Sequence, residues 1–435
     1  MDDHASTGGR NKRGLYHGWL VVGGAFLVAM YGFGLGFYGP GIYLVALKAL
    51  HGWSVAELSS AITAYYILGA ALLFFCVGPL FDRQGPRSVV TMGTVAMACG
   101  VVALTLVTRQ WQVYAALTVT SVGWATMSGA AINIIVAPWF DRRRGLALSW
   151  SLNGASAGGV LIVPLLTFLI TWFGFAIALD AVGALMLTIL IPVAAIVLRP
   201  RCPDEHDRAD SASASDKPLS PGIRSPAEAP RFRLAAVLCS SRFITISVPF
   251  ALGLTAQVGF LTHQIAFLSP TIGTVRAGWA VSLTTSAAVL GRIGTGFVVD
   301  RFERRAVACI NFIVQVLAMG ILAASTTPAM LYLGCGLFGL GVGNATSLPG
   351  LIVQHEFPPQ HFSRVVSLVV AINQFSFAFG PSLLGQLQHA QGSYGTALLV
   401  CLTMQAMAAI VVVLPAIWRD TEVAASLAKR WRRYG

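Results

Sequence analysis

The chain has 435 residues, of which 56% are hydrophobic and 11% are charged, and its formal net charge is +12. An average soluble domain carries roughly 25% charged residues, so this composition excludes a water-soluble globular protein. It is typical of a protein that crosses a membrane many times.

Apolar runs of about 20 residues recur along the sequence, and this is the length that a helix needs to cross a hydrocarbon core of about 30 Å. The predicted fold class is therefore an all-α membrane protein with twelve transmembrane helices. The predicted spans are 18–40, 55–80, 87–107, 112–137, 145–170, 173–198, 243–268, 276–299, 306–326, 329–354, 364–387 and 394–418.

Polar segments divide the chain into five parts. Residues 1–16 form a polar tail, and the apolar run that follows is too long for the core of a cleaved signal peptide. Residues 17–198 form the N-terminal six-helix half, and residues 242–418 form the C-terminal six-helix half. Residues 199–241 are rich in Pro, Ser, Ala and charge and are predicted to be a flexible cytoplasmic linker. Residues 419–435 form the second polar tail.

The basic residues lie mostly on one side of this predicted topology. Besides Arg292 inside a span, Lys48, Arg109 and Arg276 are the basic residues on the opposite side. Because cytoplasmic loops collect Lys and Arg, both termini are predicted to be cytoplasmic. The same distribution argues against a nucleic-acid partner, since the charges are scattered over short loops.

The cysteines form neither a disulfide framework nor a metal-binding spacing.

Each half repeats one cytoplasmic turn between its second and third spans. Residues 78–87 read GPLFDRQGPR and residues 296–305 read GFVVDRFERR, so Gly, Asp, Arg and a final Arg match at an offset of 218. A repeat of six-span units is a known transporter architecture. We predict that these turns form a gate, although the arginines could serve only as positive-inside anchors. The predicted gating residues are Asp82, Arg83, Arg87, Asp141, Arg142, Asp300, Arg301 and Arg305.

Arg292 is the unusual charge of this sequence, because it lies eight residues before Asp300 inside an apolar span. That position is about 12 Å from the cytoplasmic turn, near the middle of the membrane, where an arginine costs about 2.5–3.5 kcal/mol. No acidic residue is evident at this depth. We therefore predict that Arg292 binds the carboxylate of a substrate; the alternative is a structural arginine bonded to backbone carbonyls and polar side chains.

The repeated turn closely resembles the signature G-x-x-x-D-R-x-G-R-[RK] of the major facilitator superfamily, with Glu303 in place of the usual glycine in the second copy. YHGWLVV at residues 16–22, HGWSVAELSSA at 51–61, PWFDRRRGLALSWSLNGASAGG at 138–159 and FGPSLLGQLQHAQGSYGTA at 379–397 are similar to the bacterial monocarboxylate transporter and oxalate:formate antiporter branch. The resemblance implies the major facilitator fold, with two pseudo-symmetric halves, and a bacterial inner membrane.

The same resemblance implies roles for residues of spans seven and eight. Transporters of this branch place a substrate-binding arginine in a G-R pattern, which Gly291-Arg292 matches, and often carry a histidine about thirty residues earlier, which His263 fits. Mammalian relatives carry an aspartate one turn before the arginine, where this chain has Ala288. Proton coupling therefore falls to His263, which can titrate near neutral pH, or to the proton of the substrate; His263 could also be a polar group bonded across helices.

Other polar and aromatic side chains are predicted to complete the substrate site, although packing is the alternative for each. Asn373 and Gln374 lie near mid-depth in span eleven, Asn344 lies in span ten, and family architecture adds a wall residue from span four. The remaining predicted substrate-binding residues are Asn373, Asn344, Tyr31, Tyr38 and Trp124, besides Arg292 and His263.

The predicted function is a monomeric secondary transporter that moves a small monocarboxylate by alternating access, with a proton as partner. Alternatives are an organic-anion exchanger of the oxalate:formate type and a membrane carboxylate sensor that does not transport. A dianion favours a second intramembrane cation and a cationic drug favours a buried acid, and neither is seen in the spans. We expect no enzyme activity and no cofactor, since the sequence shows no phosphate loop, nucleophile–base pair or metal-ligand grouping.

Overall fold

The computed structural model describes residues 17–140, 144–198, 237–299, 301–358 and 362–434. The predicted tail 1–16, most of the predicted linker, and the predicted gating residues Asp141, Arg142 and Asp300 lie outside the described residues.

The described part of the chain is helical, and ten of its helices are long and apolar enough to cross a membrane. One of them, Val55–Ala103, contains two predicted spans. The chain turns between them at Gly85, whose φ of 75° suits glycine and not residues with a side chain. The predicted tenth span is divided into a helix from Pro328 to Val342 and a second from Leu348 to Glu356. The ten helices therefore contain eleven of the predicted spans, and the divided tenth span is the twelfth.

The N-terminal half contains helices interrupted by short π-helical turns in three spans. A π-turn is wider than an α-turn and often marks a functional site. The elements are α1 (His17–Phe33), η1 (Gly34–Tyr38), α2 (Gly39–His51), α3 (Val55–Leu72), η2 (Leu73–Val77), α4 (Gly78–Ala103), α5 (Gln110–Met127), α6 (Gly129–Val136), η3 (Ala137–Trp139), α7 (Arg144–Ala157), η4 (Gly158–Ile162), α8 (Val163–Phe173) and α9 (Phe175–Ile196).

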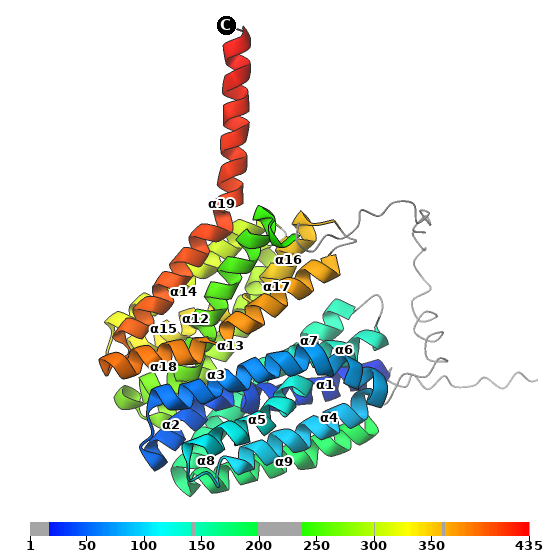
Figure 1. The fold of residues 1–435 in the computed structure, drawn as a ribbon, viewed down its shortest axis with the longest axis vertical. Coiled ribbons are helices and arrows are strands. Elements are labelled where there is room, and N and C mark those ends of the chain that lie inside the picture. The colour runs from blue at the N-terminus through cyan, green and yellow to red at the C-terminus, as the bar shows by residue number, and fades with distance from the viewer. Residues whose placement is uncertain (1–16, 141–143, 199–236, 300, 359–361, 435) are drawn as a thin grey trace, which may run out of the picture.

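The C-terminal half has its own set of packed helices, and in Figure 1 it lies above the N-terminal half. The last helix runs on to Tyr434, so it includes most of the predicted tail 419–435. The elements are α12 (Ser241–Ile272), α13 (Thr274–Val298), α14 (Arg304–Ala324), α15 (Pro328–Val342), α16 (Leu348–Glu356), α17 (Phe362–Phe377), α18 (Gly380–Gln391) and α19 (Gly395–Tyr434).

The two halves contact each other on one side of the bundle. We call the side at which α9 ends and α12 begins the linker side, and the opposite side the far side. The main packed pairs between halves are α3 with α18, α2 with α12, and α8 with α13. The Ser382 amide donates to Thr63 Oγ1 at 3.1 Å, and Ser282 Oγ donates to the Val160 carbonyl at 3.1 Å. The hydrogen bonds between halves that the described residues make all lie in the far-side part of the spans.

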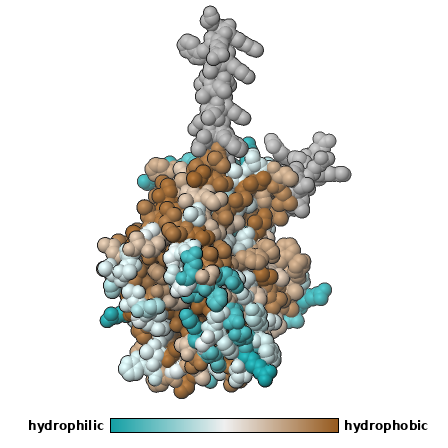
Figure 2. Space-filling view, turned by 60° about the vertical axis from the view of Figure 1, so that its left-hand side comes forward, coloured by the Kyte–Doolittle hydropathy of each residue, from teal (hydrophilic) through white to brown (hydrophobic). Residues whose placement is uncertain are grey.

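The surface carries large apolar side chains that water would disfavour. Phe74, Leu106, Trp172, Ile196 and Phe297 are each at least 70% exposed. In Figure 2, hydrophobic residues cover much of the visible face and hydrophilic residues gather in its lower part. An apolar surface of this extent marks contact with a lipid bilayer or a partner, and the helix lengths favour the bilayer.

Candidate functional site

Arg292 lies in α13, six residues before the helix ends at Val298, and its side chain is half-buried. Its Nε donates a hydrogen bond of 3.3 Å to the Gly343 carbonyl. Gly343 begins the break between α15 and α16, and a break in a helix leaves carbonyls without their intrahelical donors. Nε thus makes a backbone bond of the kind that the sequence alternative described, while the terminal guanidinium nitrogens have no hydrogen-bond partner among the described residues.

Glycines bring the backbones of α13 and the broken span together beside Arg292. A Cβ atom at Gly291 would lie 2.0 Å from the Leu340 carbonyl oxygen, and one at Gly343 would lie 2.4 Å from the Ala288 carbonyl oxygen. No side chain fits at such distances. The close contact fixes the position of the Gly343 carbonyl, and so the position of the Arg292 Nε that bonds to it.

The charge of Arg292 has no carboxylate partner in the part of the chain that the structure describes. The one ion pair found there joins Arg305 and Glu356. Tyr38, from the N-terminal half, has its hydroxyl near the Arg292 guanidinium. The structure thus brings together two predicted site residues from different halves, and neither neutralises the other.

Asn344 is held by a residue that the sequence analysis missed. Its Nδ2 donates to Asn311 Oδ1 at 3.0 Å and to the Leu340 carbonyl at 3.1 Å, and Asn311 Nδ2 donates to the Gly341 carbonyl at 3.4 Å. Asn344 Oδ1 is buried without a partner. The two asparagines therefore clamp the segment that carries the Gly343 carbonyl. An isolated asparagine in an apolar span was the available signal for Asn311.

We expect that Asn311→Leu weakens the binding of an anionic substrate about 10-fold, because Asn344 and the helix break lose their clamp. The measurement is a binding isotherm on the purified protein. Gln315→Leu is the matched control: it removes a buried amide one turn along the same helix, which bonds to Gln405 at 2.8 Å. Equal losses of affinity in both variants would show general loosening of the C-terminal half.

Trp124 lies in a group of aromatic rings of the N-terminal half. Its ring stacks on Phe37 at a centroid distance of 5.9 Å and meets Phe33 edge-on at 5.1 Å. Its Nε1 is buried without a partner. Tyr31 is 2% exposed, and among the described residues no hydrogen bond of its hydroxyl is found. Trp124 thus packs within a group of aromatic rings, and its role as a wall of the substrate site stays a prediction.

His263 is fully buried and bonded on both ring nitrogens. Its Nε2 lies 2.9 Å from the Pro381 carbonyl and 3.2 Å from Ser59 Oγ, and its Nδ1 lies 3.0 Å from the Tyr394 hydroxyl. The carbonyl can only accept, so Nε2 carries the proton and Nδ1 accepts from Tyr394. This neutral ring joins α12, α18 and the turn before α19 to Ser59 of the other half.

The structure does not bring His263 to Arg292. His263 lies nine residues before the far end of α12, and Arg292 lies eighteen residues after the far end of α13. With a rise of about 1.5 Å per residue, their depths differ by about 13 Å. Asn373 in α17 is 5% exposed, and its buried Oδ1 has no hydrogen-bond partner among the residues that the structure describes.

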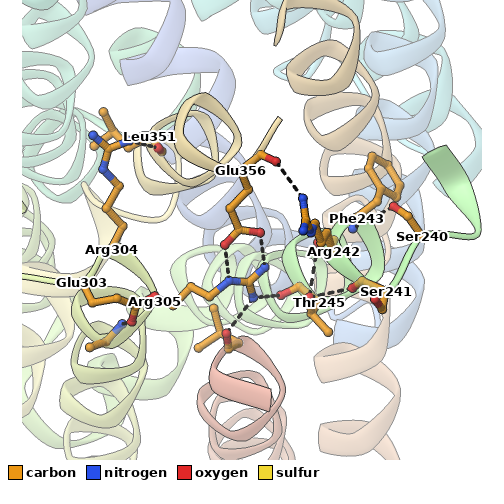
Figure 3. Close-up of polar contacts among 12 residues, drawn as sticks. Ser240, Ser241, Arg242, Phe243, Thr245, Glu303, Arg304, Arg305, Leu351 and Glu356 are labelled. Atoms are coloured by element: carbon orange, nitrogen blue, oxygen red, sulfur yellow. Dashed lines mark hydrogen bonds and ion pairs between the residues drawn. The ribbon is translucent and has the colours of Figure 1, made fainter. Parts of the chain in front are cut away.

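The predicted gating residues fall into two groups. Asp82, Arg83, Arg87 and Arg301 are exposed. Arg305 is fully buried and makes a two-pronged ion pair with Glu356, at 2.5 Å from Nε to Oε1 and 2.7 Å from Nη2 to Oε2 (Figure 3).

The Arg305 guanidinium also fixes two further helices. Its Nη1 donates to the Val412 carbonyl at 2.8 Å and to the Thr245 carbonyl at 3.2 Å. Glu356 ends α16, so the pair ties α12, α14, α16 and α19 together at the linker side. Arg87, the matching arginine of the first repeat, is exposed. The sequence repeat did not predict this difference between the two halves.

Comparison with known families decides what kind of protein carries this arrangement. The family model of the Major Facilitator Superfamily matches residues 24–276 and 265–432. The chain belongs to the major facilitator superfamily. This match confirms the resemblance seen in the repeated turns and the predicted fold class.

Relatives of this superfamily member are transporters from fungi and animals. It is 27% identical over 385 residues to the MFS transporter asaE of Aspergillus flavus, with 86% of this chain and 81% of that protein covered. It is 27% identical over 407 residues to Monocarboxylate transporter 11 of Mus musculus, with 88% and 84% covered. Among solved structures, the nucleoside transporter NupG matches with a TM-score of 0.68 at 15% identity, covering 92% of this chain and 98% of that one. The protein is an integral membrane transporter and not an enzyme.

Proposed function

We propose that this transporter carries a small monocarboxylate across the membrane by alternating access, with a proton as partner. The observation that carries the proposal is the guanidinium of Arg292, whose Nε is anchored on Gly343 while its terminal nitrogens have no partner among the described residues. A carboxylate satisfies such a pair of donors with two parallel hydrogen bonds. The similarity to Monocarboxylate transporter 11 agrees with this substrate class.

A monocarboxylate fits better than a dianion. The other Lys and Arg residues whose side chains are described lie near helix ends or in turns, and the buried one among them, Arg305, is already paired with Glu356. Exchange of oxalate with formate is therefore the weaker candidate, because the single unpaired cation found within the described part of the spans cannot neutralise two carboxylates. A non-transporting carboxylate sensor remains the alternative from another class, and uptake into vesicles separates it from a carrier.

The contacts between halves indicate from which side the substrate reaches Arg292. The halves bond to each other toward the far side, through Ser59, Thr63 and Ser282. Arg292 lies closer to the linker side, and its side chain is half-buried. We therefore place entry on the linker side in this conformation, with the exposed turn residues acting as gates. We further propose that the protein is a monomer in a bacterial inner membrane, with both termini in the cytoplasm.

We expect acid outside proteoliposomes to accelerate uptake, and His263→Gln to reduce this dependence more than it reduces binding. The reason is that His263 is a titratable ring at the contact between the halves, where a gain of charge changes how Tyr394 and Pro381 bond to it. The measurement is initial uptake rate against external pH. If His263→Gln keeps the wild-type pH dependence, the proton travels with the substrate or on another group.

A further inference from the structure

We infer that the preferred substrate is a monocarboxylate with an aromatic body, because an aromatic cluster extends away from Arg292 by way of Tyr38. The inference rests on the proposed function, since it takes the carboxylate at Arg292 as given and names what lies behind it. The aromatic cluster consists of Phe33, Phe37, Tyr66, Trp124 and Phe377.

The cluster is continuous. Its members come from α1, η1, α3 and α5 of the N-terminal half and from α17 of the C-terminal half. Phe37 lies 5.8 Å from Phe33 and 6.3 Å from Tyr66, measured between ring centroids. Trp124 contacts Phe33 at 5.1 Å and Tyr66 at 6.4 Å. Tyr66 meets Phe377 of the C-terminal half edge-on at 5.8 Å. The rings thus line the region where the two halves face each other.

Tyr38 connects this cluster to the arginine. Its ring meets Phe37 edge-on at 5.1 Å, and its neutral hydroxyl lies near the Arg292 guanidinium. Phe37 and Tyr38 are neighbours in the π-turn η1. The turn therefore places Tyr38 beside the cationic end of the site and Phe37 in its apolar part.

The accessible part of the cluster is apolar. Phe33, Phe37 and Phe377 are half-buried, whereas Tyr66 and Trp124 are buried. The proton of the Tyr66 hydroxyl is not available to a substrate, since it is donated to the Phe37 carbonyl at 3.0 Å. Tyr65 likewise donates to the Gly36 carbonyl at 2.7 Å. These bonds hold η1, and the half-buried members of the cluster are the phenyl rings of Phe33, Phe37 and Phe377.

The chemistry that this arrangement recognises is one carboxylate joined to one arene ring. Aromatic rings favour offset or edge-on contacts with another ring. Each such contact is worth roughly 2- to 10-fold in affinity. Acetate or formate would reach Arg292 and leave the phenylalanine rings without a partner. We therefore expect phenylacetate to bind at least 10-fold more tightly than acetate.

The test is a set of binding isotherms for acetate, cyclohexylacetate and phenylacetate on the purified full-length protein. The inference expects the affinity to rise in that order. Equal affinity for phenylacetate and cyclohexylacetate overturns the aromatic preference, and equal affinity for acetate and phenylacetate overturns the whole inference. In both cases the proposed function survives if Arg292→Gln abolishes binding. It fails if none of the acids binds in an Arg292-dependent way.

Two variants from different halves locate the effect. Phe37→Leu and Phe377→Leu should each weaken phenylacetate binding 3-fold or more while acetate binding changes less than 2-fold. Phe168→Leu is the matched control, because its ring is 47% exposed and pairs with Trp172 outside the cluster. Parallel losses for both acids, or the same selective loss in the control, would contradict a role of the cluster in recognising the ring.

Discussion

Replacing Arg292 by glutamine is expected to abolish the binding of monocarboxylates without unfolding the protein. The guanidinium keeps one hydrogen bond to the Gly343 carbonyl and has no carboxylate partner among the described residues. Breaking a buried charged pair costs about 2–5 kcal/mol of binding free energy. The folded state loses little, since an unpaired charge within the membrane is itself unfavourable. Binding isotherms and thermal unfolding of the same purified samples measure both effects.

Two further variants make this expectation specific. Arg292→Lys should restore little binding, because an ammonium is a point charge and lacks the planar pair of donors. Arg276→Gln removes an exposed arginine at the far end of the same helix, and it should bind like the wild type. If Arg292→Gln folds and binds the acid with wild-type affinity, the arginine is architectural and the proposed site is wrong.

Glu356→Ala is expected to lower the stability of the C-terminal half strongly. The carboxylate, with its side chain 13% exposed, pairs with Arg305, whose side chain is 1% exposed. Removing one partner of a buried pair leaves an uncompensated charge and costs about 3–5 kcal/mol. Thermal unfolding followed by intrinsic fluorescence should show a markedly lower midpoint.

The double variant Arg305→Met with Glu356→Leu separates charge from packing. Removing both charges is often neutral for stability, so this protein should unfold closer to the wild type than Glu356→Ala does. Glu303→Gln is the control, since this exposed carboxylate at the N-cap of α14 accepts, among the described residues, only the Ala306 amide. If Glu303→Gln lowers the unfolding midpoint as much as Glu356→Ala does, the buried pair contributes no more to stability than an exposed carboxylate.

The spans could be predicted from the sequence because apolar length is a local property. The twelve runs and the repeated turn needed no knowledge of distant contacts. The break in the tenth span was visible as the glycine- and asparagine-containing stretch around Gly343, but its consequence was not. Which carbonyl it frees, and that Arg292 Nε takes it, depends on how α13 packs at Gly291.

The site was predictable as residue types but not as pairs. Arg292 stood out because a charge in an apolar span is costly, and Tyr38 was a candidate on chemistry alone. Their proximity crosses the two halves and cannot be deduced from spacing. The same holds for Asn311 beside Asn344, and for Ser59, which joins the other half to His263. Arg305 was expected at a gate, whereas its buried partner Glu356 comes from a helix that the repeat does not mention.

Uptake of radiolabelled monocarboxylates into proteoliposomes tests the central claim most directly. Vesicles with the wild-type protein, vesicles with Arg292→Gln and protein-free vesicles are compared for labelled acetate and phenylacetate, so that passive leak of the protonated acids is subtracted. The account predicts saturable uptake of at least one acid by the wild type, and uptake at the level of protein-free vesicles for Arg292→Gln. Uptake of neither acid by the wild type, or equal uptake by the wild type and Arg292→Gln, would contradict it.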